Sequence, residues 1–289
     1  MSDSPAASDR RSLVEQIRQL GPWHQNIRLT DDFEIQDAFS EQERERKHNN
    51  NISLIDARHR FEYKAKLIYP DGLAGKRFLD CACNAGGYCF WARELGAEAV
   101  FGFDVRDHWI NQARFVQQNR SCAPVDNLQF DVCDLMKLPE RGIEPADFTL
   151  FKGIFYHLAD PILGLKIAAD MTREVLWFNS ARCFIDNTES LYCTFEAPQN
   201  LMSGVHALSW TPSGPSVIAK LLYWLGFRDI RHVFSKENPD RPGFGRMEIM
   251  AAREPGLLDR FAEAESAETI DVASYKNARQ ATDEMKAMF

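Results

Sequence analysis

The sequence predicts an α/β fold, a doubly wound sheet of about seven strands with helices on both faces. From residue 77 onward, short apolar runs typical of strands alternate with segments of helical spacing, and such alternation indicates a parallel sheet. The hydrophobic content is 45% of 289 residues, with 20 Phe and 6 Trp, which is enough for a large core. We therefore expect a ligand site at the carboxyl ends of the strands.

The elements follow from periodicity in chain order. A helix is expected over residues 9–20, ending at Gly21-Pro22, and another over 53–69. Strands are expected at 77–83, 99–105, 128–134, 147–153 and 174–181, with helices at 86–95, 107–119 and 161–172 between them. A helix at 214–225 precedes two last strands, 228–234 and 246–252, which we expect to form a hairpin at the sheet edge.

Three parts follow from this pattern. Residues 1–70 form an N-terminal helical extension or cap, residues 71–253 the α/β domain, and residues 254–289 a helical tail rich in Ala and Glu. Residues 182–213 interrupt the strand–helix rhythm. A connection of that length inside a compact domain is often a functional lid, so we interpret it as one.

Composition narrows the class of protein. No apolar run reaches the roughly 18 residues of a membrane helix, and the N-terminus lacks the apolar segment of a signal peptide, so we expect a cytoplasmic protein without a membrane partner. Seven cysteines without a CxxC pair offer no set of zinc ligands, so no metal is expected. The net charge of −8 disfavours a nucleic-acid partner without excluding one.

The turn after the first strand carries the main functional signal. It reads Asp80-Cys81-Ala82-Cys83-Asn84-Ala85-Gly86, an acidic strand end followed by small residues that let a ligand approach the backbone. It does not fit the G-x-G-x-x-G loop of dinucleotide sites, and a carboxylate there suits a cation better than a phosphate. We also expect Asp104 to accept hydrogen bonds from a ribose diol and Asp134 to receive an adenine amino group. Three acids at three strand ends describe an adenosyl pocket.

These residues carry a resemblance to a known family. "LDCACNAGGYCFWARELGA" followed by "VFGFDV" resembles the S-adenosyl-L-methionine loop and second strand of class I methyltransferases. Ala82 stands where that family more often has glycine, and an alanine is tolerated there if its φ stays negative. The resemblance implies a set of cofactor-binding residues: Asp80, Ala82, Asn84, Gly86, Asp104, Asp134, Leu135 and Lys152.

A narrower resemblance spans roughly residues 21–250. "GPWHQNIRL" (21–29), "KGIFYHLADPILGL" (152–165) and "ALSWTPSGPSVIAKLLYWLGFRDIRHV" (207–233) resemble the tRNA wobble-uridine carboxymethyltransferases and related methyltransferases. That family uses a carboxylated cofactor, and its basic residue after Pro-Trp is replaced here by Gln25, so ordinary S-adenosylmethionine is favoured. The resemblance places ligand-contacting polar side chains at Lys64, Tyr156 and Arg246. We interpret Lys64 and Arg246 as residues that bind an anionic acceptor.

Further site residues follow from the expected positions of the segments. Methyl transfer to a hydroxyl benefits from a base at the attacking oxygen, and His157 with Tyr156 beside it is the candidate catalytic pair. The N-terminal segment and the 182–213 insertion are expected to cover the pocket. The resulting substrate-binding candidates are Trp23, His24, Lys64, Glu196, Trp210 and Arg246.

Three functions stay open at this point. The favoured one is O-methylation of a small polar or anionic metabolite, such as a sugar-like or hydroxylated acceptor. The second is tRNA wobble-uridine (carboxy)methyl transfer, which requires a basic surface at the pocket mouth. The third is a non-catalytic scaffold that binds the cofactor, because a fold does not fix a function.

Overall fold

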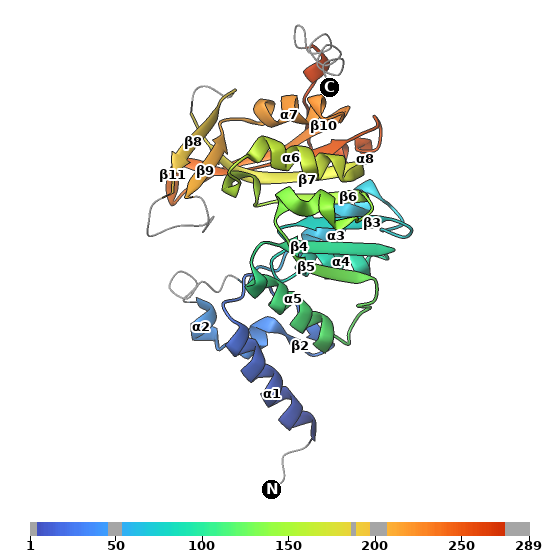
Figure 1. Cartoon of the computed structure of the whole chain (residues 1–289), viewed down its shortest axis with the longest axis vertical. Coiled ribbons are helices and arrows are strands. Elements are labelled where there is room, and N and C mark those ends of the chain that lie inside the picture. The colour runs from blue at the N-terminus through green and yellow to red at the C-terminus, as the bar shows by residue number, and fades with distance from the viewer. Residues whose placement is uncertain (1–4, 46–53, 186–188, 197–206, 275–289) are drawn as a thin grey trace.

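A computed structural model describes residues 5–45, 54–185, 189–196 and 207–274 of the chain. Eight strands of this described part form one sheet in the order β12-β10-β11-β7-β6-β3-β4-β5. Figure 1 shows the sheet across the middle of the molecule, with the N-terminal helix α1 (Pro5–Leu20) at the bottom and the C-terminal segments at the top.

The half of the sheet that begins the domain is parallel, and the other edge is antiparallel. The parallel strands are β3 (Arg77–Cys81), β4 (Ala99–Asp104), β5 (Leu128–Val132), β6 (Ala146–Lys152) and β7 (Thr172–Cys183). The long hairpin of β10 (Asp229–Asn238) and β11 (Arg241–Ala252) pairs antiparallel with β7, and the short β12 (Glu268–Thr269) extends the edge. The predicted doubly wound sheet is confirmed. Its strand order reverses at β3, which has β4 on one side and β6 on the other.

Helices cover both faces of the sheet, and each face has its own apolar core. Helices α3 (Arg58–Ile68), α4 (Gly87–Glu94) and α5 (Asp107–Asn119) contribute Phe61, Phe90 and Ile110 to one core. Helices α6 (Pro161–Asp170) and α7 (Pro215–Trp224) contribute Leu165 and Ile218 to the other. The strands between them are apolar on both sides because both of their faces are covered.

The N-terminal segment packs on the α5 side of the domain. It contains α1, the small hairpin β1 (Arg28–Thr30) and β2 (Phe33–Glu34), a 3₁₀ turn (Ile35–Ala38) and α2 (Glu41–Glu45). Trp23 is fully buried there, and its indole N–H donates to the Ile17 carbonyl at 2.8 Å. Gln112 of α5 donates to the Leu20 and Pro22 carbonyls, which fastens this segment to the domain.

The structure gives more detail than the sequence prediction in two segments, residues 182–213 and residues 254–289. Within the predicted lid 182–213 lie the end of β7 and an antiparallel pair, β8 (Leu191–Phe195) and β9 (Leu208–Pro212), whereas residues 186–188 and 197–206 lie outside the described residues. Within the predicted helical tail, only α8 (Asp259–Glu265) is α-helical in the described part. It is followed by β12 and a 3₁₀ turn (Val272–Ser274), and residues 275–289 lie outside that part.

Helices α6 and α7 both begin at residues that favour the start of a helix. Asp160 precedes α6, and its carboxylate accepts a hydrogen bond from the Leu163 amide at 3.0 Å, with Pro161 in the first turn. Helix α7 also has a proline, Pro215, in its first turn, but Gly214 before it provides no side-chain cap. None of the helices in residues 5–45, 54–185, 189–196 and 207–274 is long and apolar enough to cross a membrane.

Candidate active site

The loop between β3 and α4 turns by alternating left-handed residues. Ala82 has φ +60°, Asn84 has φ +55° and Gly86 has φ +81°. The condition under which an alanine is readily tolerated at this position, a negative φ, is therefore not met. Ala82 directly follows the end of β3, and the amide of the next residue, Cys83, donates a hydrogen bond to the Phe103 carbonyl of β4 at 2.8 Å. The loop thus keeps an alanine in a region that costs such a residue roughly 1–2 kcal/mol.

Hydrogen bonds hold this loop in one shape. The Asn84 side-chain oxygen accepts from the Ala85 amide at 2.8 Å, and the Gly86 amide donates to the Cys83 carbonyl at 2.9 Å. Gly86 has no room for a side chain, because a Cβ there would lie 2.7 Å from the Phe130 ring. Gln25, from the N-terminal segment, accepts from the Gly87 amide at 2.8 Å. The N-terminal segment therefore caps the first turn of α4.

The cysteines of this turn are packing residues. A Cβ built on Gly102 would lie 2.7 Å from the Cys89 sulfur and 3.1 Å from the Cys83 sulfur, so the two thiols fill the space over that glycine. Burial raises the pKa of Cys83 to about 11 and raises the pKa of Cys89 well above the ordinary value of a thiol. Both thiols are therefore protonated at neutral pH, which is unsuited to a nucleophile or a metal ligand. No group of three or more metal-ligating side chains occurs in the described part of the chain.

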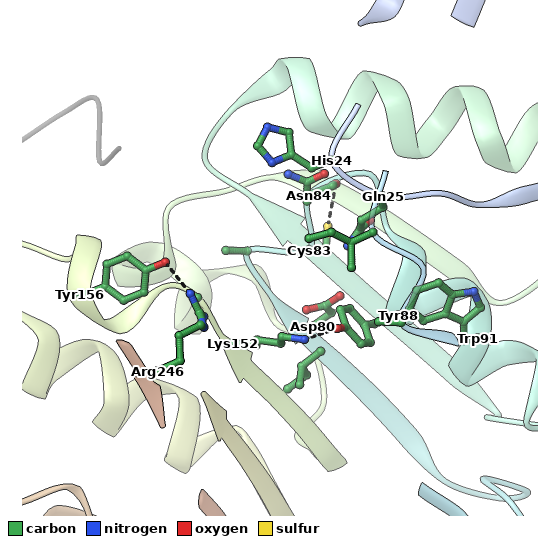
Figure 2. A pocket seen from close by; sticks show the side chains of 15 residues that line it. His24, Gln25, Asp80, Cys83, Asn84, Tyr88, Trp91, Lys152, Tyr156 and Arg246 are labelled. Carbon is green, nitrogen blue, oxygen red and sulfur yellow. Dashed lines mark hydrogen bonds between the residues drawn. The ribbon is translucent and has the colours of Figure 1, made fainter. Parts of the chain in front are cut away.

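A cavity of about 290 Å³ opens beside this loop, at the carboxyl ends of β3 and β6. This is the point where the strand order reverses, the usual ligand position in an open α/β sheet. Figure 2 shows side chains from the N-terminal segment, the loop, α4, β6 and β11 turned toward the same space. The residues lining it are His24, Gln25, Ile55, Ala57, Asp80, Ala82, Cys83, Asn84, Tyr88, Trp91, Leu150, Lys152, Gly153, Tyr156 and Arg246.

One wall of the cavity carries cations and phenols. The Lys152 ammonium donates a hydrogen bond to the Tyr88 hydroxyl, and the Arg246 guanidinium lies 3.5 Å from the Tyr156 hydroxyl (Figure 2). Burial lowers the pKa of Lys152 to about 8, opposed by the nearby charges of Glu248 and Asp80. This wall therefore presents hydrogen-bond donors, two of them on cationic side chains.

The acidic group of the cavity is Asp80. Its side chain is buried at the end of β3 and accepts a hydrogen bond from the Cys89 thiol at 3.8 Å. Burial raises its pKa to about 8, and the Lys152 charge opposes that rise. At pH 7 the Asp80 carboxyl group is therefore largely protonated, and a cation bound beside it would favour its charged form, whose oxygens have capacity to accept further hydrogen bonds.

The two other acids lie at neighbouring strand ends without lining this cavity. Asp104 accepts hydrogen bonds from the Asn84 amide at 3.2 Å and the Arg106 amide at 3.1 Å, and burial raises its pKa. Asp134 is exposed and accepts from the Met136 amide at 3.0 Å, which begins the 3₁₀ helix Leu135–Arg141. Leu135 is buried in that turn. Each carboxylate keeps unused lone pairs for additional donors.

His157 lies next to Tyr156 but does not line the cavity. It ends a short 3₁₀ turn (Phe155–His157), its ring centroid lies 3.9 Å from that of Tyr156, and its Nδ1 lies 3.5 Å from a Glu196 carboxylate oxygen. Burial lowers its pKa to about 4, with Glu196 opposing the shift, so the ring is neutral at pH 7. Trp210, on β9, has a buried indole N–H without a partner in the described residues. Glu196, directly after β8, thus lies close to His157.

Four of the six predicted substrate residues do not line the cavity: Glu196, Trp210, Trp23 and Lys64. Trp23 belongs to the core beneath α1. Lys64 is 3% exposed, and its ammonium pairs with Glu248 and, at 2.9 Å, with Glu265 of α8. His24, by contrast, lines the cavity and stands edge-on to Trp109, with centroids 4.9 Å apart. Of the predicted residues, the cavity therefore gathers His24, Asp80, Ala82, Asn84, Lys152, Tyr156 and Arg246.

Sequence reasoning did not identify Gln25, Tyr88 or Asn179 as site residues. Gln25 was noted only as a missing cation, although its side chain caps α4. Tyr88 is four residues after Asn84, within the first turn of α4, a position from which a side chain reaches back over the loop. Asn179 follows the apolar run "VLWF" of β7, and a polar residue inside a buried strand is the signal that could have identified it.

Comparisons with known proteins agree with this geometry. A family model described as a methyltransferase domain matches residues 73–202. The tRNA U34 carboxymethyltransferase of Idiomarina loihiensis is 23% identical over 231 residues, which are 79% of this chain and 64% of that protein. The enzyme of the same name from Campylobacter hominis is 30% identical over 115 residues, 39% of each protein. The chain therefore matches less than two thirds of the length of these relatives.

Solved structures of similar fold include the N-terminal domain of EvdMO1, crystallised in the presence of SAH and D-fucose. It superposes with a TM-score of 0.61 at 16% identity and covers 85% of this chain and 97% of that domain. The crystal structure of EvdMO1 superposes with a TM-score of 0.58 at 14% identity, and the match covers 87% of this chain and 49% of the EvdMO1 chain. At such identity the likeness concerns the fold, a Rossmann-like sheet with helices on both faces.

Proposed function

We propose that this chain, a class I S-adenosylmethionine-dependent methyltransferase that resembles the tRNA U34 carboxymethyltransferases, methylates an oxygen of a small polar or anionic acceptor. The cavity at the reversal point of the sheet is the observation that carries the proposal. It combines a buried carboxylate, Asp80, on one side with Lys152, Arg246 and two tyrosine hydroxyls on the other. Such a site suits one cationic and one anionic or hydroxylated group side by side.

The residues present fit the cofactor. The buried carboxyl group of Asp80, whose hydrogen-bond donor in the described part of the chain is the weak Cys89 thiol, would accept a hydrogen bond from the ammonium group of the cofactor. The loop from Ala82 to Gly86 would lie along the amino-acid end of the cofactor. Asp104 would accept from the ribose hydroxyls, and Asp134 with Leu135 would border the adenine. When bound, S-adenosylmethionine supplies an electrophilic methyl group on a sulfonium. A carboxylate-lined strand end suits that positive charge better than it suits a phosphate.

The acceptor would lie against the wall of donors. Tyr156 and Arg246 would hold a hydroxyl or carboxylate of the acceptor, with Lys152 beside them. His157 is neutral at pH 7, which is the protonation state required of a base, and its ring lies against Tyr156. In this proposal His157 receives the proton that the acceptor hydroxyl loses, and Glu196 stabilises the resulting imidazolium.

Isothermal titration with S-adenosylmethionine and S-adenosylhomocysteine tests the cofactor assignment. Gly86→Ala should weaken both affinities by about tenfold or more, because the new methyl group would meet Phe130 and deform the loop. Gly75→Ala is the matched control, since Gly75 has a similar φ of +70° but open space where a Cβ would lie. Absence of binding to the wild-type chain, or equal effects of the two substitutions, would contradict the proposal.

Turnover separates an enzyme from a cofactor-binding scaffold. Incubation of the purified chain with S-adenosylmethionine and a fractionated pool of polar metabolites should release S-adenosylhomocysteine, and mass spectrometry should find an acceptor heavier by one methylene. His157→Ala should reduce this rate by roughly 10²–10⁴-fold while leaving cofactor affinity unchanged. A chain that binds the cofactor and transfers nothing to any acceptor would instead be a scaffold.

Transfer of a carboxymethyl or methyl group to a tRNA wobble uridine is the second candidate. The relatives carry that name, and Tyr156 and Arg246, which the family resemblance marks as ligand contacts, both line the cavity. The net charge of −8 opposes it. Binding of tRNA whose affinity falls steeply with salt would favour this function, because phosphate contacts release counterions.

A further inference from the structure

A row of polar side chains crosses the sheet next to the cavity. Lys152 of β6 is the register partner of Asn179 on β7, and Asn179 is the partner of Glu248 on β11. Directly paired residues of neighbouring strands point to the same face of a sheet. Arg246, two residues before Glu248 on β11, shares that face. The row therefore lies among the apolar side chains under α3, where every polar atom requires a partner.

Asn179 stands between a cation and an anion. It is 3% exposed, and its side-chain oxygen accepts from Arg246 Nη2 at 2.7 Å and Nε at 3.1 Å. Its side-chain nitrogen donates to Glu248 Oε2 at 3.1 Å. A guanidinium only donates and a carboxylate only accepts, so these two partners fix the orientation of the amide. The amide aims the guanidinium and separates it from the Glu248 carboxylate.

The charge of Glu248 is already matched from the other side. Its second carboxylate oxygen accepts from Lys64, which also pairs with Glu265 of α8. Arg246 has neutral partners in the described part of the chain, the Asn179 amide and the Tyr156 hydroxyl. Its side chain is exposed and lines the cavity. A positive charge is thus held at the cavity wall while the nearest buried carboxylate is bound elsewhere.

We infer that Asn179 is a specificity-determining positioning residue, which keeps Arg246 directed at the cavity and free of Glu248 so that it pairs with a carboxylate of the bound ligand. The inference rests on the proposed function, in which ligands occupy this cavity. The carboxylate could belong to a carboxylated form of the cofactor or to an anionic acceptor. An uncharged ligand of the same shape would gain less from this arrangement, because a guanidinium binds a carboxylate more strongly than a neutral acceptor.

The double substitution Asn179→Asp with Glu248→Gln tests the inference. It moves one negative charge from position 248 to position 179 and leaves the net charge unchanged. The introduced glutamine can still accept from Lys64 and donate to the introduced carboxylate, so each buried partner keeps a hydrogen bond. That carboxylate would neutralise the guanidinium directly. Glu265→Gln, on α8 at the other partner of Lys64, is the control because Glu265 contacts neither Asn179 nor Arg246.

Two arms of titration calorimetry locate the carboxylate. The first compares the affinities for S-adenosylmethionine and for its carboxylated form. The second compares malonate with neutral malonamide, with and without saturating S-adenosylhomocysteine. In one of the two arms the wild-type chain and Glu265→Gln should prefer the anion by about tenfold or more. That arm identifies the source. The double variant should lose the preference and bind S-adenosylmethionine within about threefold of wild type.

The inference is overturned if the wild-type chain prefers the anion in neither arm, or if the double variant keeps the wild-type preference. Should the double variant fail to fold, Arg246→Gln at an exposed position must abolish the preference, and its retention overturns the inference equally. Failure of the proposed function looks different. In that case S-adenosylmethionine and S-adenosylhomocysteine do not bind, while malonate without cofactor still reports on Arg246.

Discussion

Ala82 lies in the loop on which the cofactor assignment depends, and its backbone is left-handed, a conformation that glycine adopts without steric strain and alanine does not. Ala82→Gly removes the clash of Cβ with the backbone at φ +60°, so we expect the free energy of unfolding to rise by roughly 1 kcal/mol. Ala85→Gly, at a neighbouring buried alanine outside the left-handed set, should lower it by about 1 kcal/mol. Urea unfolding of the three chains measures both. A loss of stability in Ala82→Gly would contradict the role assigned to its φ.

His157 should make stability depend on pH. Burial lowers its pKa from 6.5 to about 4, so between these values the unfolded chain binds the additional proton. The contribution of His157 is therefore complete above pH 6.5 and is lost as pH falls toward 4. From pH 7 to pH 5 the wild-type chain should lose up to about 2 kcal/mol more than His157→Gln does.

Urea unfolding at the two pH values gives this difference directly. His59→Gln, at an exposed histidine, is the matched control for removing an imidazole elsewhere. Identical pH dependence in the wild-type chain and His157→Gln would show that burial of the ring does not hold it neutral.

At the scale of single elements, two acids begin two turns but have different expected roles. Asp134 and Asp160 each accept from a backbone amide at 3.0 Å, so replacing either by alanine should lower the free energy of unfolding by about 1 kcal/mol. Asp134→Ala alone should also weaken S-adenosylhomocysteine binding by about tenfold, because it removes an acceptor proposed for the adenine. Calorimetry and urea unfolding of both variants separate the effects. Equal cofactor affinities would exclude Asp134 from the site.

The strands and helices between residues 77 and 181 could be predicted because their apolar periodicity changes clearly at each boundary. The acids Asp80, Asp104 and Asp134 could be placed near one another because parallel strands end on the same edge. The position of Lys64 could not be predicted, because its partner Glu248 lies 184 residues away and helical spacing does not tell which charge a buried lysine meets. Strand β12 has two residues, too few for any periodic signal.

The candidate site could be predicted only in part, because chain order places some of its residues and strand register places the others. Residues carried by the loop and by the end of β6 follow from chain order, whereas Asn179 depends on the register of β7 between β6 and β11. The place of His157 beside Tyr156 follows from its position after β6, whereas its Nδ1 contact with Glu196, 3.5 Å away and directly after β8, could not be predicted from chain order. Its role as a base stays a prediction.

At the scale of the whole molecule, the C-terminal segment belongs to the packed domain. Phe261 of α8 is fully buried against the α3 side, with the Lys64 ammonium 5.7 Å from its ring centroid. Phe261→Ala should therefore lower the free energy of unfolding by about 3–4 kcal/mol. Phe195→Ala, at a phenylalanine that is 85% exposed, should change it by about 0.5 kcal/mol or less. Urea unfolding compares the two, and similar effects would mean that α8 packs only loosely.

The polar row of Lys152, Asn179 and Glu248 also has a consequence for how the chain folds. Strand β11 must insert between β7 and β10, and a slip of one residue would turn Glu248 toward the apolar side chains beneath α6 and α7. An unpaired buried carboxylate costs several kcal/mol, so every misaligned pairing is penalised. The same amide that orients Arg246 therefore marks the correct alignment of the last long strand, and selection for ligand charge and selection for correct folding act on one residue.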